Sequence, residues 1–186
     1  GMALSAVCGA FSSFIVYFAN NKEGMQTIAY WMMGSLAGAQ WGELAVIAPI
    51  IMASILFFWT QSRVLNLMLL GDESAITMGT DLHAYRQWYL LISSLIVGFA
   101  VYSAGMIGFV GLIVPHVIRM FTGPDHKRLL PVAALVGAIF LVVADGLCRV
   151  IIPHTELPIG ILISMIGAPS FIYLMIKKTY GFGGSD

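Results

Sequence analysis

The sequence predicts an all-α polytopic membrane protein with six transmembrane helices, a short outer interfacial helix and short cytoplasmic helices. The 186 residues are 59% hydrophobic and only 10% charged, whereas soluble domains carry about 25% charged residues. The mean hydropathy is +0.91. The apolar runs are continuous rather than alternating, which favours membrane-spanning helices over strands.

The apolar runs define the expected spans within a single transmembrane domain over residues 1–186. A spanning helix needs roughly 20 predominantly apolar residues. Polar residues 20–23 end the first run, and polar residues 61–63 end the second. Residues 25–38 are too short to span and have an amphipathic pattern, which predicts an interfacial helix. The expected spans are about 1–19, 43–60, 88–104, 107–121, 130–152 and 158–176.

Residues 63–86 form the largest water-facing segment of the sequence. Within it, residues 69–80 are expected to form two short helices hinged at a glycine, with Asp72 and Glu73 at a helix N-terminus, where acidic groups are favourable. A connector of this length in a compact bundle usually has a function. A docking surface for a cytoplasmic partner is the functional interpretation, and a solvated connector is the alternative.

The distribution of Lys and Arg predicts the orientation, because cytoplasmic loops carry the excess of these residues. Placing 63–86 inside puts seven basic residues on or near the cytoplasmic side, namely Arg63, Arg86, Arg119, Lys127, Arg128, Lys177 and Lys178. Only Lys22 and Arg149 then fall outside. The first span is therefore expected to run outward, and the C-terminus to lie in the cytoplasm.

Two spans carry stripes of small residues. In the first span these are Gly1, Ser5, Gly9 and Ser13, with Ser12 at the same level as Ser13. In the last span, which begins at Pro158 and is expected to kink at residues 167–169, they are Gly160, Ser164 and Gly167. Such stripes allow close helix packing. Helix packing and the wall of a polar pathway are the two interpretations.

Asp145 and Arg149 lie four residues apart in an otherwise apolar run, so they share a helix face and can form an ion pair. Ionisable residues inside membrane segments suggest function. Arg149 is expected near the outer interface, where it could present positive charge to an external partner. Glu156 follows in the short outer loop.

An intramembrane metal-dependent enzyme is the alternative that His116, His126 and Asp145 raise. The sequence contains no HExxH spacing, and the two cysteines, Cys8 and Cys148, lie in apolar runs without metal-ligand spacing. We therefore expect no catalytic residue, no metal site and no cofactor. The net charge of zero provides no basic surface for nucleic acid.

Motifs across nearly the whole chain resemble one transporter family. They are residues 30–35, Leu70 to Ala75 with Gly79, Gly105 through Arg119, residues 125–131, Ala144 and Asp145 with Arg149, and residues 156–160 with 167–169. In this order they are similar to the C-terminal half of FecCD-type permeases of type II ABC importers. This ten-span family takes up iron-siderophores, haem and vitamin B12.

The resemblance implies that the six spans correspond to family helices five to ten. It assigns ATPase coupling to Leu70, Gly71, Asp72, Glu73, Ser74, Ala75 and Gly79. It assigns the translocation path to Ser5, Gly9, Ser12, Ser13, Gly160, Ser164 and Gly167, and docking of a substrate-binding protein to Arg149 and Glu156. The implied partners are a cytoplasmic ABC ATPase, that binding protein, a second permease copy and the lipid of a bacterial plasma membrane.

The chain contains no GxxxxGK[ST] nucleotide-binding loop, so ATP hydrolysis is expected in the partner rather than here. The family's first four spans have no counterpart in the sequence, and we expect residues 1–186 alone not to transport. Ferric siderophore is the favoured substrate over haem or cobalamin. A membrane scaffold without a path is the remaining alternative.

Overall fold

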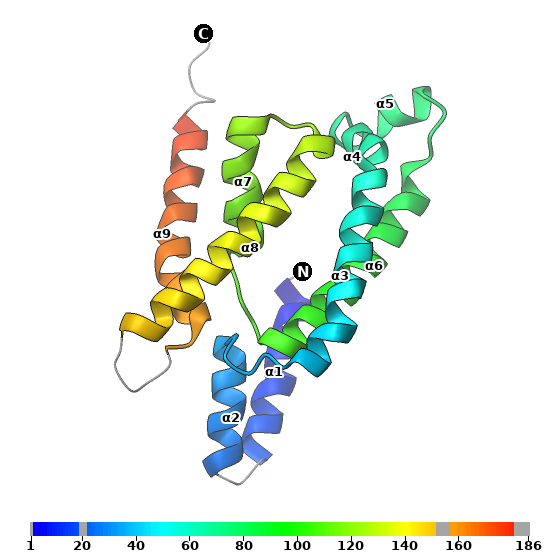
Figure 1. Cartoon of the computed structure of the whole chain (residues 1–186). Coiled ribbons are helices and arrows are strands. Elements are labelled where there is room, and N and C mark those ends of the chain that lie inside the picture. The colour runs from blue at the N-terminus through cyan, green and yellow to red at the C-terminus, as the bar shows by residue number, and fades with distance from the viewer. Residues whose placement is uncertain (1, 19–21, 152–156, 181–186) are drawn as a thin grey trace.

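A computed structural model describes residues 2–18, 22–151 and 157–180, and every regular element in these residues is an α-helix (Figure 1). In chain order the helices are α1 (Met2–Phe18), α2 (Lys22–Met33), α3 (Trp41–Thr60), α4 (Ser62–Leu69), α5 (Asp72–Thr77), α6 (Leu82–Ala104), α7 (Val110–Thr122), α8 (His126–Ile151) and α9 (Ile159–Tyr180). The all-α expectation is confirmed for this part of the chain.

The long helices run between two ends of the molecule. At one end lie α4, α5 and the turn between α7 and α8, and α9 runs toward the same end (Figure 1). We call this the α4–α5 end. The most extensive packing is between α7 and α8, and α8 also packs on α3, α4 and α9. The α1–α2 pair extends from the opposite end, which we call the far end, and α1 packs chiefly against α2.

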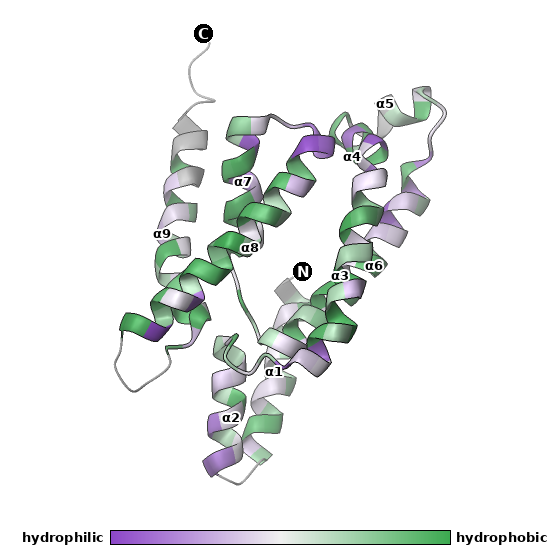
Figure 2. Ribbon diagram, viewed as in Figure 1, coloured by the Kyte–Doolittle hydropathy of each residue, from purple (hydrophilic) through white to green (hydrophobic). Residues whose placement is uncertain are grey.

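Among the residues that the structure describes, three helices are long and apolar enough to cross a membrane: α3, α6 and α8. Helices α1 and α7 and the first part of α9 are apolar but shorter; the 13 residues of α7 extend only about 20 Å at 1.5 Å per residue. Hydrophobic residues cover much of α7 and the middle of α8, and hydrophilic residues gather near α4 and at the start of α2 (Figure 2).

Several expected boundaries were wrong, for local reasons. Helix α6 begins at Leu82 rather than 88, because the Asp81 side chain accepts a hydrogen bond from the His83 N–H and caps the helix; residues 82–86 are therefore helical rather than part of a loop. The helix expected over 25–38 covers Lys22–Met33, and its interfacial position stays a prediction. Helix α9 continues through Pro169 as one helix, and the kink expected at residues 167–169 stays a prediction.

Helix α7 begins at Val110 rather than 107 because the chain before it is not helical. Gly105 ends α6 with φ 71°, and Phe109 has φ 63°. A left-handed backbone is uncommon for a bulky residue and costs on the order of 1–3 kcal/mol. Phe109 is packed against α9 at Gly167, where an added Cβ would lie 2.7 Å from the Phe109 Cβ. The tertiary packing therefore holds this strained residue in place.

Three backbone segments meet closely at the far end, at Gly34, Gly105 and Gly160. The Ser35 N–H donates to the Ala104 carbonyl at 2.9 Å, and the Met106 N–H donates to the Trp31 carbonyl at 3.4 Å. A Cβ on Gly105 would collide with the Trp31 carbonyl oxygen, and one on Gly160 with the Met33 carbonyl oxygen. This glycine junction joins the end of α2, the α6–α7 connection and the start of α9.

The described residues bury only a small core. One cluster contains Ala144 and Cys148 of α8 with Ile159 and Ile163 of α9, and a second contains Val114, Ile118 and Leu129. Large apolar side chains are exposed elsewhere along the helices; Val142 is 71% exposed and Val150 79%. Apolar surface of this extent indicates contact with lipid or with further protein.

Candidate functional site

The α4–α5 end contains the residues to which ATPase coupling was assigned. Helices α4 and α5 are separated by Leu70 and Gly71, which has φ 90°, and α5 is followed by Gly79, with φ 77°. Ala75 is fully buried, and α5 packs against α4 and α6. The expected glycine hinge between two short helices is confirmed, and Asp72 begins the second of them. The first helix was expected within residues 69–80 but covers Ser62–Leu69.

An apolar surface is exposed at this end. Leu70 is 59% exposed and Ile76 69%. We define the α4–α5 apolar surface as Leu69, Leu70, Ile76 and Met78, all of which are exposed by about half or more. The sequence prediction included Leu70 but not Ile76 or Met78, because only the fold shows that Ala75 is buried while Ile76 and Met78 remain exposed. Exposed apolar surface on short helices is suited to protein docking.

Behind this surface, the side chain of Asn66 joins α4 to the start of α8. Its Nδ2 donates to Asp125 Oδ1 at 2.7 Å, and its Oδ1 accepts from the His126 backbone N–H at 2.9 Å. The Asn66 Oδ1 also lies 2.8 Å from His126 Nδ1; an amide oxygen can only accept, so Nδ1 carries the proton. We call this group the Asn66 clasp.

Two further contacts support the clasp. Asp125 Oδ1 also accepts from the Lys127 N–H at 3.0 Å and so caps α8. The hydrogen bonds from Asn66 and then from the Lys127 backbone lower the pKa of Asp125 below its usual value. The depressed pKa means that the ionised form strengthens the clasp at neutral pH, and this contribution is lost only as the pH falls through the lowered value. Trp59 Nε1 donates to the Lys127 carbonyl at 3.0 Å.

The small residues of α1 do not meet α9 in extended packing within this chain, because α1 packs against α2 while α9 packs against α7, α8 and α2. Ser12 donates to the Cys8 carbonyl of its own helix at 3.0 Å. Nothing among the described residues lies within 4 Å of a Cβ placed on Gly9. The assignment of Ser5, Gly9, Ser12 and Ser13 to a path stays a prediction.

The small residues of α9 are used in packing. Gly160 and Gly167 are buried and Ser164 is partly buried. Gly160 lies against the end of α2, and Gly167 against Phe109 and Ile113. Their assignment to a path also stays a prediction, and the structure adds a packing requirement at both glycines.

The expected ion pair is confirmed at the end of α8. Arg149 Nε donates to Asp145 Oδ2 at 2.8 Å, and the Arg149 side chain is 49% exposed. The guanidinium is therefore accessible at the far end, at the place where docking of an external protein was predicted. Glu156, the other residue of that prediction, lies outside the described residues.

The residues of the metal-enzyme alternative do not form a site. His126 and Asp145 lie 19 positions apart on the single helix α8, which separates their backbones by about 28 Å. His126 is bonded to Asn66, and Asp145 to Arg149. Within residues 2–18, 22–151 and 157–180, no three His, Cys, Asp or Glu side chains are grouped as metal ligands.

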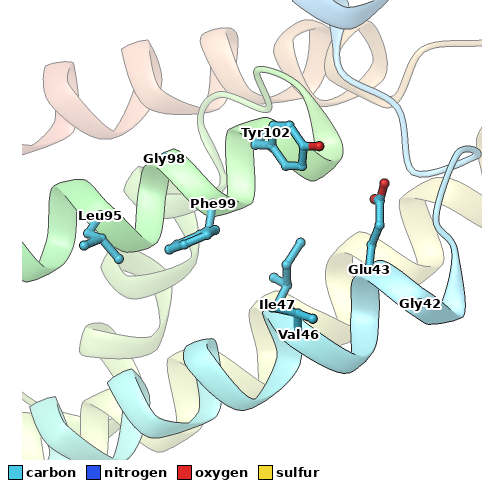
Figure 3. Close-up of a pocket in the computed structure, with 8 residues that line it drawn as sticks. All are labelled: Gly42, Glu43, Val46, Ile47, Leu95, Gly98, Phe99 and Tyr102. Atoms are coloured by element: carbon cyan, nitrogen blue, oxygen red, sulfur yellow. The ribbon is translucent and has the colours of Figure 1, made fainter.

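A groove of about 610 Å³ separates α3 from α6 near the far end (Figure 3). Its walls are almost entirely apolar, with Glu43 at the start of α3 and Tyr102 near the end of α6. A second apolar cavity of about 340 Å³ lies among α3, α6, α7 and α8. Neither has the convergent polar groups typical of a specific small-molecule site.

Comparisons with known proteins match the chain over nearly its full length. Residues 1–177 match the model of the FecCD transport family. The chain is 40% identical over 178 residues to the hemin transport system permease protein of Yersinia pestis, covering 96% of this chain and 53% of that protein. It is 41% identical over 175 residues to the cobalamin import system permease protein of Halobacterium salinarum, covering 94% of this chain and 46% of that protein.

The fold is also similar to a solved structure, described as an inward-facing conformation of a transporter of the metal-chelate ABC type. The TM-score is 0.89 at 34% identity, covering 95% of this chain and 57% of the other. The chain thus spans about half the length of the relatives that it matches. On the family match over residues 1–177, this chain belongs to the FecCD transport family.

Proposed function

We propose that this chain forms part of the permease of an ATP-driven importer in the plasma membrane, with six membrane spans, and that its α4–α5 end docks on a cytoplasmic ABC ATPase. The observation that carries the proposal is the α4–α5 apolar surface, which is exposed on two short helices at one end of the bundle. The family match supports it, since the relatives are named as import and transport permeases.

The mechanism follows from the mechanical connections of that end. ATP binding would move the ATPase surface, and α4 and α5 would move with it as a rigid body. Helix α4 is bonded to the start of α8, and the far part of α8 is packed on the start of α9. In a dimer, the translocation path would lie between this chain and a second permease copy. Such motion would change the distance between α1 and α9 of this chain and the same two helices of the second copy.

The substrate class is a bulky metal chelate. The relatives are named for hemin, cobalamin and vitamin B12, which are large metallated rings, and the similar structure is of the metal-chelate type. Ferric siderophore, which the family resemblance favours, belongs to the same class by size. The exposed Arg149 would meet a carboxylate of the substrate-binding protein, with Glu156 in the same outer region.

Reconstitution tests the proposal. The permease containing this chain, with its ATPase and its binding protein, is placed in liposomes and supplied with haem, cobalamin or a ferric siderophore. We expect ATP-dependent accumulation of one of them and co-purification of the ATPase. Loss of ATPase association, or no ATP-dependent uptake of any of the three, would contradict the importer function and would favour a scaffold.

Substitution of Gly79 provides a sharper test of coupling. A Cβ at Gly79 meets nothing within 4 Å, but φ is 77°. Gly79→Val should therefore distort the turn after α5 through backbone strain of about 1–3 kcal/mol, and uptake per ATP hydrolysed should fall. Gly79→Asn is the matched control, because asparagine tolerates a left-handed backbone. Unchanged uptake in Gly79→Val would count against this turn as part of the docking site.

A further inference from the structure

The side chain of Asn66 holds helix α4 to the start of α8. Both the donor and the acceptor of its amide are bonded to the first turn of α8. The Asn66 amide donates to Asp125 and accepts from the backbone and the ring of His126, at 2.7 to 2.9 Å. Asn66, Asp125 and His126 are all partly buried. Bonds that satisfy the first N–H groups of a helix also set the position of its first turn.

Helix α8 extends from this clasp to the far end of the molecule. Its 26 residues span about 39 Å. Leu129, in its first turn, is buried against α7. Near its other end, Ala144 and Cys148 are buried against Ile159 and Ile163 at the start of α9. A displacement applied at the first turn of α8 therefore reaches the start of α9 through one continuous helix.

We infer that Asn66 is the positioning residue through which displacement of α4 is transmitted to α8, and from α8 to the start of α9, during ATP-driven transport. The inference rests on the proposed function, because it assumes that an ATPase moves α4. Packed side chains, hydrogen-bond networks and rigid helices can carry energetic coupling between distant sites. The Asn66 clasp is such a hydrogen-bond network, and it joins Asn66 to Asp125 and His126, which lie 59 and 60 residues further along the sequence.

The chemistry of the clasp allows the two partners to be exchanged. In Asn66→Asp, two carboxylates would face each other and repel. In the double variant Asn66→Asp with Asp125→Asn, the amide nitrogen at 125 can donate to the carboxylate at 66. Asp125 Oδ1 accepts both from Asn66 and from the Lys127 N–H, so an amide nitrogen in its place restores the first bond and gives up the second. The carboxylate at 66 can accept from His126. The bond between positions 66 and 125 and the bonds to His126 then have counterparts, whereas the Lys127 N–H loses its side-chain acceptor.

The test measures substrate molecules imported per ATP hydrolysed by the complete transporter in liposomes, together with ATPase co-purification and thermal stability. For Asn66→Asp we expect this ratio to fall by about tenfold or more, because the variant loses the hydrogen bond from Asn66 to the charged Asp125. Co-purification of the ATPase and ATP hydrolysis should continue. The double variant should recover part of the ratio, because it restores the bond between α4 and the start of α8 but not the cap at Lys127. A purely structural role would instead lower stability and yield at an unchanged ratio, and that outcome would overturn the inference.

Trp59→Phe is the matched control. It removes one hydrogen bond to the same turn of α8, at Lys127, but the bond comes from α3 rather than α4. The ratio should change little. An equal fall in Trp59→Phe and Asn66→Asp would show general loosening of the turn and overturn the inference. Absence of ATP-dependent uptake by the unmodified transporter would overturn the proposed function as well, whereas an unchanged ratio in Asn66→Asp overturns this inference alone.

Discussion

Replacing Ile76 with Asp should abolish stable association of the permease with its ATPase. Ile76 is 69% exposed on α5, so the substitution removes no core contact and should change fold stability by no more than about 0.5 kcal/mol. At the centre of a protein interface, however, it would bury an unpaired carboxylate. The expected loss of binding free energy is about 2–4 kcal/mol, and pull-down of the ATPase by the purified permease measures it.

The control for this substitution is Ile76→Leu, which keeps the apolar character and volume and should retain the ATPase. A second comparison is Ala75→Leu, because Ala75 is fully buried; this variant should reduce the folded yield instead. Retention of the ATPase by Ile76→Asp at wild-type affinity would show that the α4–α5 apolar surface is not the docking surface.

Replacing Gly105 with Ala should produce a large loss of stability. Gly105 has φ 71° and ψ −167°, a region that is essentially confined to glycine, and an added Cβ would collide with the Trp31 carbonyl and lie 2.9 Å from the Gly34 Cα. Strain and collision together should cost about 3 kcal/mol or more. Thermal unfolding of the purified permease should shift down by about 10 °C.

Gly98→Ala is the matched control for this loss. Gly98 lies in the same helix, α6, and a Cβ there would meet nothing within 4 Å. Alanine is favoured over glycine inside a helix by about 1 kcal/mol, so the thermal midpoint should stay the same or rise. If both variants unfolded at the same temperature as the unmodified protein, the close backbone approach at the glycine junction would be contradicted.

Features that depend on local sequence were predictable. Continuous apolar runs indicated the long helices, and a glycine between two short apolar pieces indicated the hinge at Gly71. The i, i+4 spacing of Asp145 and Arg149 predicted their ion pair, which forms at 2.8 Å. In each case the relevant atoms lie within a few residues, so helix geometry alone determines the contact.

Features that depend on neighbours distant in sequence were not predictable. Asn66 and Asp125 are 59 residues apart, and no periodicity relates them. Gly160 and Gly167 were correctly identified as a small-residue stripe, but only the fold shows that α2 and Phe109 pack against them. Hydropathy did not indicate the start of α6 at Leu82, because the first turns of this helix contain polar residues. The capping residue Asp81 is the local signal for this start.

Cysteine labelling at Met78 tests the central claim most directly, namely that the α4–α5 end faces the cytoplasm and binds the ATPase. Cys8 and Cys148 are first replaced, and single cysteines are introduced as Met78→Cys at this end and Trp41→Cys at the far end, where the native side chains are 62% and 88% exposed. A membrane-impermeant maleimide should label position 78 only in inside-out vesicles, with protection by added ATPase, and position 41 only in intact cells. Labelling of position 78 from outside intact cells, or no protection by the ATPase, would contradict the claim.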